Sequence, residues 1–203
     1  MKTLKVKLTF TESILGTCPS NEDIYREYIG SKSPDAATIE DEVEALGAEI
    51  VAEKAMTVFP RNAHGAPFLY DYQIKGFFKD TCGGLRKVSS TKSAKIKAFK
   101  KEIDKLIFPF PREIVFENYE PMGECQRPLR AATPQGERIS LAISEEIPAG
   151  ATVTFEIVMH CDEHEAVVRE WLDYGRFSGI GQWRNSGKGR FTWEEVESAT
   201  VLL

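Results

Sequence analysis

Two segments near opposite ends of the chain alternate apolar and polar residues, and this pattern constrains the fold most strongly. Residues 4–10 and residues 153–159 each place an apolar side chain at every second position. Successive side chains of a strand point to opposite faces of a sheet, so each segment is expected to be a strand with one buried face. The two strands are expected to belong to one core.

The segments between these strands predict an α+β fold. A strand or loop over 69–74 leads into a helix, and a second helix is expected after Ser89 and Ser90. A strand over 113–117, a helix over 163–174 and a last strand over 191–203 follow. The order strand, helix, strand, strand, helix, glycine-rich loop, strand is that of a ferredoxin-like or RNA-recognition-type fold.

At 203 residues the chain is expected to form a single domain, residues 1–203. Residues 12–70 are expected to be an inserted, partly helical segment, with one short helix over 22–29 and another that begins near Asp35. Residues 124–144 contain Pro128 and a Pro-Gln-Gly turn sequence beside alternating apolar positions, which predicts a projecting β-hairpin.

The loop expected over 175–190 has the composition of a polyanion-binding loop. Residues 179–189 contain two Gly-x-Gly pairs around five residues, and four glycines allow backbone amides to approach a ligand. No Walker ending is present, and an arginine occupies the third-glycine position of a dinucleotide fingerprint. The candidate nucleic-acid-binding residues here are Gly179, Gly181, Trp183, Arg184, Gly187, Lys188, Gly189 and Arg190. The alternative is a tight turn whose glycines only allow close packing.

Four further basic residues are candidates for phosphate contact. Lys75 and Lys79 lie near the start of an expected helix, where the helix dipole favours anions. Arg127 and Arg130 flank the expected hairpin. The alternatives are ordinary surface lysines, and arginines that bind a neighbouring subunit.

Charge is unevenly distributed along a chain whose net charge is −5. Seven acidic residues fall within 35–53, whereas residues 75–101 hold nine basic residues and one acid. This segregation predicts one acidic and one basic face, which could dock on each other in neighbouring copies. Two solvated helices of different sign are the alternative.

Several function classes lack support in the sequence. The four cysteines form no Cys-x-x-Cys pair and are expected to be reduced in a cytoplasmic protein, and no apolar run is long enough to span a membrane. No metal site, cofactor site or catalytic triad is expected. The adjacent pairs Glu145-Glu146 and Glu194-Glu195 point to opposite faces of a strand and are expected to be solvated or capping residues.

The glycine-rich segment resembles the hallmark of the RAMP superfamily, the repeat-associated proteins of CRISPR effector complexes. That hallmark is Gly-h-Gly-x5-Gly-h-Gly before the last strand, where h is hydrophobic; residues 179–189 match it except that Lys188 occupies the second hydrophobic position. Leu15-Gly16, residues 74–79 and the Glu-x-Ile-Pro-x-Gly-x-x-Phe-like residues 145–155 are similar to further motifs of the type III backbone subunits.

The resemblance implies a non-catalytic subunit with a palm and a thumb-like hairpin that binds single-stranded nucleic acid independently of sequence. RNA is the expected ligand and DNA the alternative, and the chain is expected to form a homo-oligomer or to join a ribonucleoprotein complex. A phage-borne or stand-alone relative would fit as well. A metal-dependent ribonuclease that uses Asp23 or Asp35 and a protein-interaction decoy of an effector subunit remain open.

Overall fold

A computed structural model of the chain describes residues 1–20, 56–133 and 136–197. The two helices expected over 22–29 and from near residue 35 lie outside the described residues, as do the candidate residues Asp23 and Asp35. No helix within the described ranges is both long enough and apolar enough to cross a membrane.

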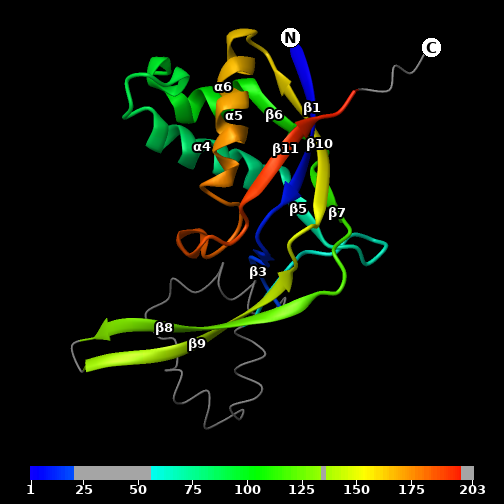
Figure 1. Cartoon of the computed structure of the whole chain (residues 1–203), viewed down its shortest axis with the longest axis vertical. Helices are drawn as coiled ribbons and strands as arrows, with labels where there is room; N and C mark the ends of the chain where they lie inside the picture. Colours follow the sequence, from blue (N-terminus) through cyan, green and yellow to red (C-terminus); the bar gives the residue numbers. More distant parts are fainter. Residues whose placement is uncertain (21–55, 134–135, 198–203) are drawn as a thin grey trace.

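The core is an antiparallel sheet of six strands in the order β11-β1-β10-β7-β5, with β6 also paired to β10 (Figure 1). Its strands are β1 Lys2–Phe10, β5 Phe68–Tyr70, β6 Ile107–Phe110, β7 Glu113–Glu117, β10 Thr152–Met159 and β11 Phe191–Glu195. Four strands that the sequence predicts are therefore neighbours in this sheet, in the order β11, β1, β10 and β7. This arrangement confirms the α+β fold with a ferredoxin-like palm.

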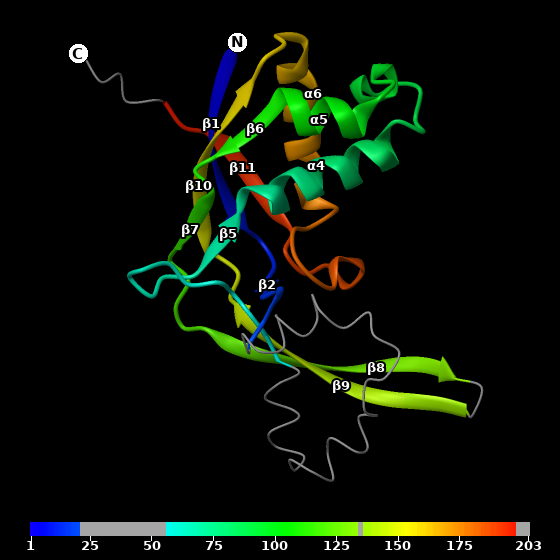
Figure 2. The same cartoon turned by 180° about the vertical axis from the view of Figure 1, so that it is seen from behind.

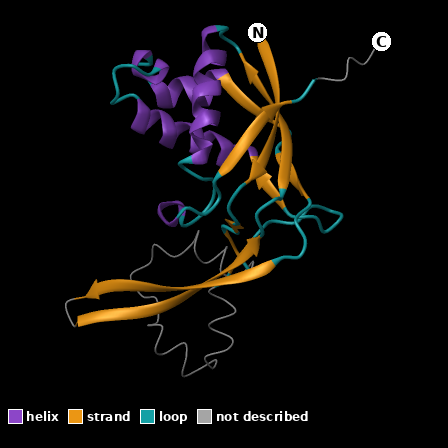
Figure 3. Cartoon of the chain, in the orientation of Figure 1, coloured by secondary structure: helices purple, strands orange, loops and turns teal. Residues whose placement is uncertain are grey.

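The α-helices of the described residues cover one face of this sheet (Figure 3). They are α4 Asp71–Leu85, α5 Phe99–Leu106 and α6 Glu163–Asp173. The apolar positions of β1 are buried against them, and aromatic rings fill the interior: the ring of Phe78 lies 5.3 Å from that of Trp171, and Phe77 lies 5.2 Å from Phe191. Alternation in the strands and helical spacing above them therefore meet in one core.

A second sheet lies at one end of the palm and carries a long hairpin (Figures 1 and 2). Its strands are β2 Ile14–Leu15, β3 Cys18–Pro19, β4 Thr57–Val58, β8 Gly123–Thr133 and β9 Gly136–Ile147. Strands β8 and β9 pair antiparallel along their length, and in both views they project from the end of the palm toward the side on which the helices lie. The hairpin base, by contrast, is anchored through pairing of β9 with β2 and β4.

The segment before α5 is not part of that helix, although the sequence predicts one helix from Ser89 and Ser90. Residues Lys92–Lys95 form a separate 3-10 turn, η1. The backbone amides of Lys92 and Ser93 donate to the carboxylate of Glu170 at 2.8 and 3.0 Å. A side chain of α6 therefore satisfies these amides and holds a break in the helix, so α5 begins at Phe99.

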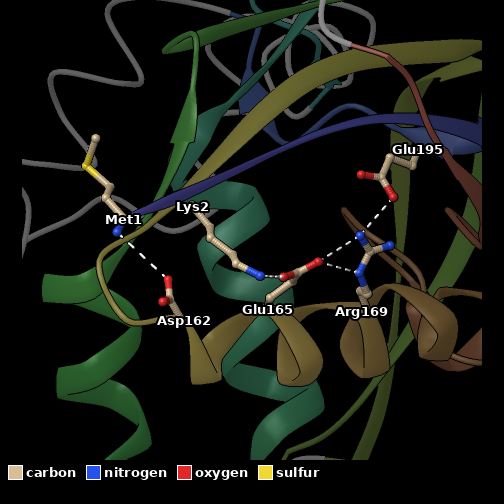
Figure 4. Close-up of polar contacts among 6 residues, drawn as sticks. All are labelled: Met1, Lys2, Asp162, Glu165, Arg169 and Glu195. Carbon is tan, nitrogen blue, oxygen red and sulfur yellow. Dashed lines mark hydrogen bonds and ion pairs between the residues drawn. The ribbon is translucent and has the colours of Figure 1, made fainter.

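An exposed network of ion pairs joins α6 to both neighbouring strands (Figure 4). Glu165 accepts from Lys2 of β1 at 2.7 Å and from Arg169 at 2.9 Å, and Arg169 also binds Glu195 of β11 at 2.8 Å. Hydrogen bonds from Lys2 and Arg169 lower the pKa of Glu165. Exposed pairs contribute only about 0.2–1 kcal/mol each, so the network adds little to the stability of the fold.

Candidate nucleic-acid interface

Two glycines allow the two ends of the glycine-rich loop to lie in close backbone contact. We call this contact, between residues 179–180 and 188–189, the neck of the loop. A Cβ atom on Gly179 would lie 2.1 Å from the carbonyl oxygen of Lys188, and one on Gly189 would lie 2.0 Å from that of Ile180. The Ile180 amide donates to the Gly189 carbonyl at 3.0 Å across this contact. Close backbone packing therefore accounts for these two glycines. The same neck is joined to the turn between β1 and β2, because the Gly189 amide donates to the Ser13 carbonyl at 2.8 Å.

The loop tip presents Trp183, whose side chain is 41% exposed. This residue has a φ of 55°, a conformation that costs a non-glycine residue about 1–3 kcal/mol. Arg127, at the hairpin base, compensates: its guanidinium lies 5.3 Å from the Trp183 ring, and its Nη2 donates to the Gln182 side chain. Two residues that the sequence nominated separately, 56 positions apart by numbering (183 − 127), thus support each other.

Arg127 is only 8% exposed, and its Nε and Nη1 atoms have no hydrogen-bond partner among the described residues. It therefore lies inside the joint between loop and hairpin. Arg130 is on β8 opposite Ile139, in a stretch whose side chains the structure does not describe.

Lys188 binds the hairpin base. Its ammonium donates to Glu146 of β9 at 2.6 Å and to Ser13 at 2.6 Å, and Ser13 also donates to Glu146. The neighbouring Glu145 binds Arg61 and accepts from the Phe59 amide at 2.8 Å. The two glutamates point apart, as expected, but each is half-buried in a polar contact, so the expectation that they are solvated is wrong.

Glu146→Gln is expected to lower the free energy of unfolding by about 1 kcal/mol at pH 7, because both charged side chains keep some contact with water. Partial burial opposes ionisation of Glu146, but hydrogen bonds from Lys188 and Ser13 outweigh it and lower the pKa of this carboxyl. The stabilisation is therefore complete above the ordinary glutamate range and lost as the pH falls through the lowered value.

Thermal unfolding of wild type and variant at several pH values between 7 and 3 checks this. The difference in Tm should shrink toward zero at the acid end. Glu194→Gln is the control, since the exposed Glu194 carboxylate forms no ion pair with a described residue. A Tm difference that is the same at every pH would contradict an ionic origin.

Lys75 and Lys79 both face α5. Lys75 donates to the backbone carbonyl of Asp104 at 3.2 Å and lies 4.3 Å from the centre of the Phe108 ring, while Lys79 pairs with the Asp104 carboxylate at 2.5 Å. Neither is in the first turn of α4, where Gln73 caps the Tyr70 amide at 2.8 Å. Lys79 also reaches the groove described next.

A groove of about 840 Å³ lies between α4, the start of α5 and the glycine-rich loop. We call it the basic groove, because among the described residues five cationic side chains and one carboxylate line it. The cations are Lys79, Lys87, Lys100, Arg184 and Arg190. The carboxylate, Asp80, is paired with Arg184 at 3.0 Å.

Aromatic rings form part of the groove lining. Phe99, Tyr174 and Phe177 line it, and Phe177 is 63% exposed. A groove with excess positive charge and exposed ring faces can hold phosphates and stack on bases. It brings together three sequence candidates, Lys79, Arg184 and Arg190, and leaves out Lys75, Arg127 and Lys188.

Sequence reasoning missed the aromatic wall and Lys100. Phe99 fits the apolar spacing of a helix, and Lys100 was one of several lysines spread around it. An available signal was the pair Tyr174 and Phe177, which follow the last apolar position of α6 where a buried face is no longer needed.

Within the described residues no group of three or more histidine, cysteine, aspartate and glutamate side chains could hold a metal ion. His160 and His164, near each other in sequence, have separate neighbours: the His160 ring lies 5.6 Å from Phe108, and His164 lies 3.3 Å from Glu102.

Fold and groove together define an α+β protein with a ferredoxin-like palm, a long hairpin and a basic surface beside a glycine-rich loop. Among solved structures, a chain in the cryo-EM structure of the type III-B Cmr-beta complex bound to cognate target RNA has a similar fold, with a TM-score of 0.54 and 11% identity. The match covers 96% of this chain and 58% of that chain, so this protein spans a little over half of its length. No protein-family model and no curated protein matches the sequence. The likeness shows that the two chains share an overall fold.

Proposed function

We propose that this protein is a non-catalytic subunit that binds single-stranded RNA independently of sequence. The observation that carries the proposal is the basic groove, where five cations and three aromatic rings line one surface next to the glycine-rich loop. The structural neighbour belongs to a complex bound to target RNA, which supports the same ligand class.

The groove chemistry favours sequence-independent contact. Lysine and arginine side chains bind phosphates, which are the same at every nucleotide, and aromatic rings stack on any base. Single strands expose their base faces, whereas those of a duplex are stacked inside. The excess charge is local, which reconciles RNA binding with a net charge of −5.

We also propose that copies of the chain assemble head-to-tail on the strand. Lys97 and Lys101, which lie outside the groove, form no ion pair with a described residue, while residues 35–53 carry seven acids. Basic and acidic stretches on one chain favour heterologous contacts between copies, and such contacts extend into open filaments.

Fluorescence anisotropy with labelled 12-nucleotide strands at two salt concentrations tests the RNA-binding function. RNA strands of different sequence are expected to bind with affinities within a few-fold of each other, and binding should weaken with salt at a log–log slope of about −0.7 per phosphate contacted. Duplex DNA should bind more weakly, and a DNA single strand shows how far the 2′-hydroxyls matter. Absence of binding to every strand at low salt would refute the function and favour a protein-interaction role.

A further inference from the structure

Three glycines of α4 line the basic groove although the fold does not require them. Gly76, Gly83 and Gly84 lie within the helix Asp71–Leu85, where glycine is the least favourable residue after proline. A Cβ atom added at Gly76 or Gly84 would meet no other atom within 4 Å, and one at Gly83 would meet only the Phe99 ring at 3.7 Å, an ordinary contact. Alanine would fit at each position, so internal packing does not explain these glycines.

The absent side chains leave the backbone of α4 bare where it lines the groove. Gly83 and Gly84 lie one turn after Asp80 and one turn before Lys87, and all four residues line the groove. A bare helix surface lets a flat group approach the backbone more closely than any side chain would allow. The neck glycines differ, because there another backbone segment fills that space.

A second observation at the same groove points independently to a ligand. Thr81 is 2% exposed and lines the groove, yet its hydroxyl has no hydrogen-bond partner within the described part of the chain. The Nε atom of Arg190, another lining residue, is likewise buried without a described partner. Buried polar atoms are normally paired, so a polar partner that enters the groove would complete the pairing of these two atoms.

The wall near the glycines is aromatic. Phe99 contacts the position of Gly83, and the rings of Tyr174 and Phe177 lie 5.6 Å apart. Lys87 and Lys100 line the same space. The groove therefore offers a bare floor, ring faces, unpaired polar atoms and cations for a phosphate.

We propose that the Gly83–Gly84 floor of the basic groove is a cradle for a nucleobase of the bound strand, which is a deeper reading of the proposed RNA-binding function and rests on it. The base lies over the bare α4 backbone against the aromatic wall. The Thr81 hydroxyl, which can donate or accept, and the Arg190 guanidinium meet its polar edge, and Lys87 and Lys100 bind the flanking phosphates. A hydroxyl that serves in either role suits any of the four bases.

The double variant Gly83→Ala/Gly84→Ala tests the cradle, because it should separate stability from binding. Each of the two replacements of helical glycine by alanine is expected to raise the Tm by about 2–4 °C, because neither new methyl group would meet a close contact. Wild type should bind a 12-nucleotide RNA about ten-fold more tightly than an abasic strand with the same sugar-phosphate backbone. The variant should lose most of that preference and keep its affinity for the abasic strand.

Gly123→Ala is the matched control, since Gly123 has open space around it and does not line the groove. It should leave the preference for base-bearing RNA unchanged. The cradle is refuted if the double variant keeps the wild-type preference, if it is less stable than wild type, or if wild type binds both strands equally. In the last case the RNA-binding function stands, whereas failure of wild type to bind either strand overturns both proposals.

Discussion

Gly189→Ala is expected to lower the free energy of unfolding by about 3–5 kcal/mol, the largest effect of a single methyl group in the described part of this chain. Two costs add. Gly189 has a φ of 71°, which strains any residue with a Cβ atom, and that atom would lie 2.0 Å from the carbonyl oxygen of Ile180. The Ile180 carbonyl belongs to the neck of the glycine-rich loop, where the amide of the same residue donates to the Gly189 carbonyl, so a shift of Ile180 away from the new methyl group would strain that hydrogen bond.

Urea denaturation of wild type, Gly189→Ala and Gly187→Ala measures this. Gly187 has a similar φ of 90°, but its Cβ would meet only the side chain of Arg190 at 3.4 Å, so its substitution should cost about 1–2 kcal/mol. The difference in unfolding free energy between the two variants measures the cost of the clash between the new methyl group and the Ile180 carbonyl. Equal losses would mean that the neck adjusts freely and that the steric account of Gly189 is wrong.

Patterns that act over short sequence distances predicted the palm well. The alternation of β1 and β10 and the helical spacing of α6 depend only on which face is buried, and these strands and this helix form the core. The break before α5 was not predictable in this way. Glu170, 77 residues beyond Ser93 by numbering (170 − 93), takes the amides that would have continued the helix, and no local pattern carries that contact.

The candidate interface was harder to predict, because some of its basic side chains line the groove whereas others are bound to carboxylates within the fold. Arg184 and Lys188 look alike in the glycine-rich segment, yet Arg184 lines the basic groove and Lys188 is bound to Glu146 of the hairpin base. The groove itself is assembled from α4, α5 and the loop after α6. Sequence marks residues that are suited to phosphate, whereas tertiary contacts decide which of them are available for it.

The glycine-rich loop is in direct contact with the base of the β8–β9 hairpin, and this contact bears on function. Arg127 under Trp183 and Lys188 beside Glu146 connect the glycine-rich loop to the base of β8 and β9 at two points. Whatever holds the loop tip therefore also orients the hairpin. This coupling provides a structural role for arginine and lysine residues that sequence alone assigns to phosphate.

The triple variant Lys87→Ala/Lys100→Ala/Arg184→Ala is expected to weaken binding of single-stranded RNA at least about ten-fold at low salt. Each phosphate contact contributes about 0.7 to the slope of log affinity against log salt, so the loss of three contacts should reduce that slope by about 2. Since all three side chains line the open groove, and only Arg184 forms an ion pair with a described residue, the fold should remain intact. Anisotropy titrations at several salt concentrations between about 50 and 200 mM give both the affinity and the slope of log affinity against log salt.

Lys92→Ala/Lys95→Ala/Lys105→Ala is the control that makes this decisive. It removes the same charge from exposed positions that do not line the basic groove. Long-range attraction depends on total charge and would weaken equally in both variants, whereas phosphate contact depends on position. A slope that falls only in the groove variant assigns the contacts to the groove. Equal reductions in the two variants would mean that RNA senses only the overall field, and the groove would then lose its claim to be the binding surface.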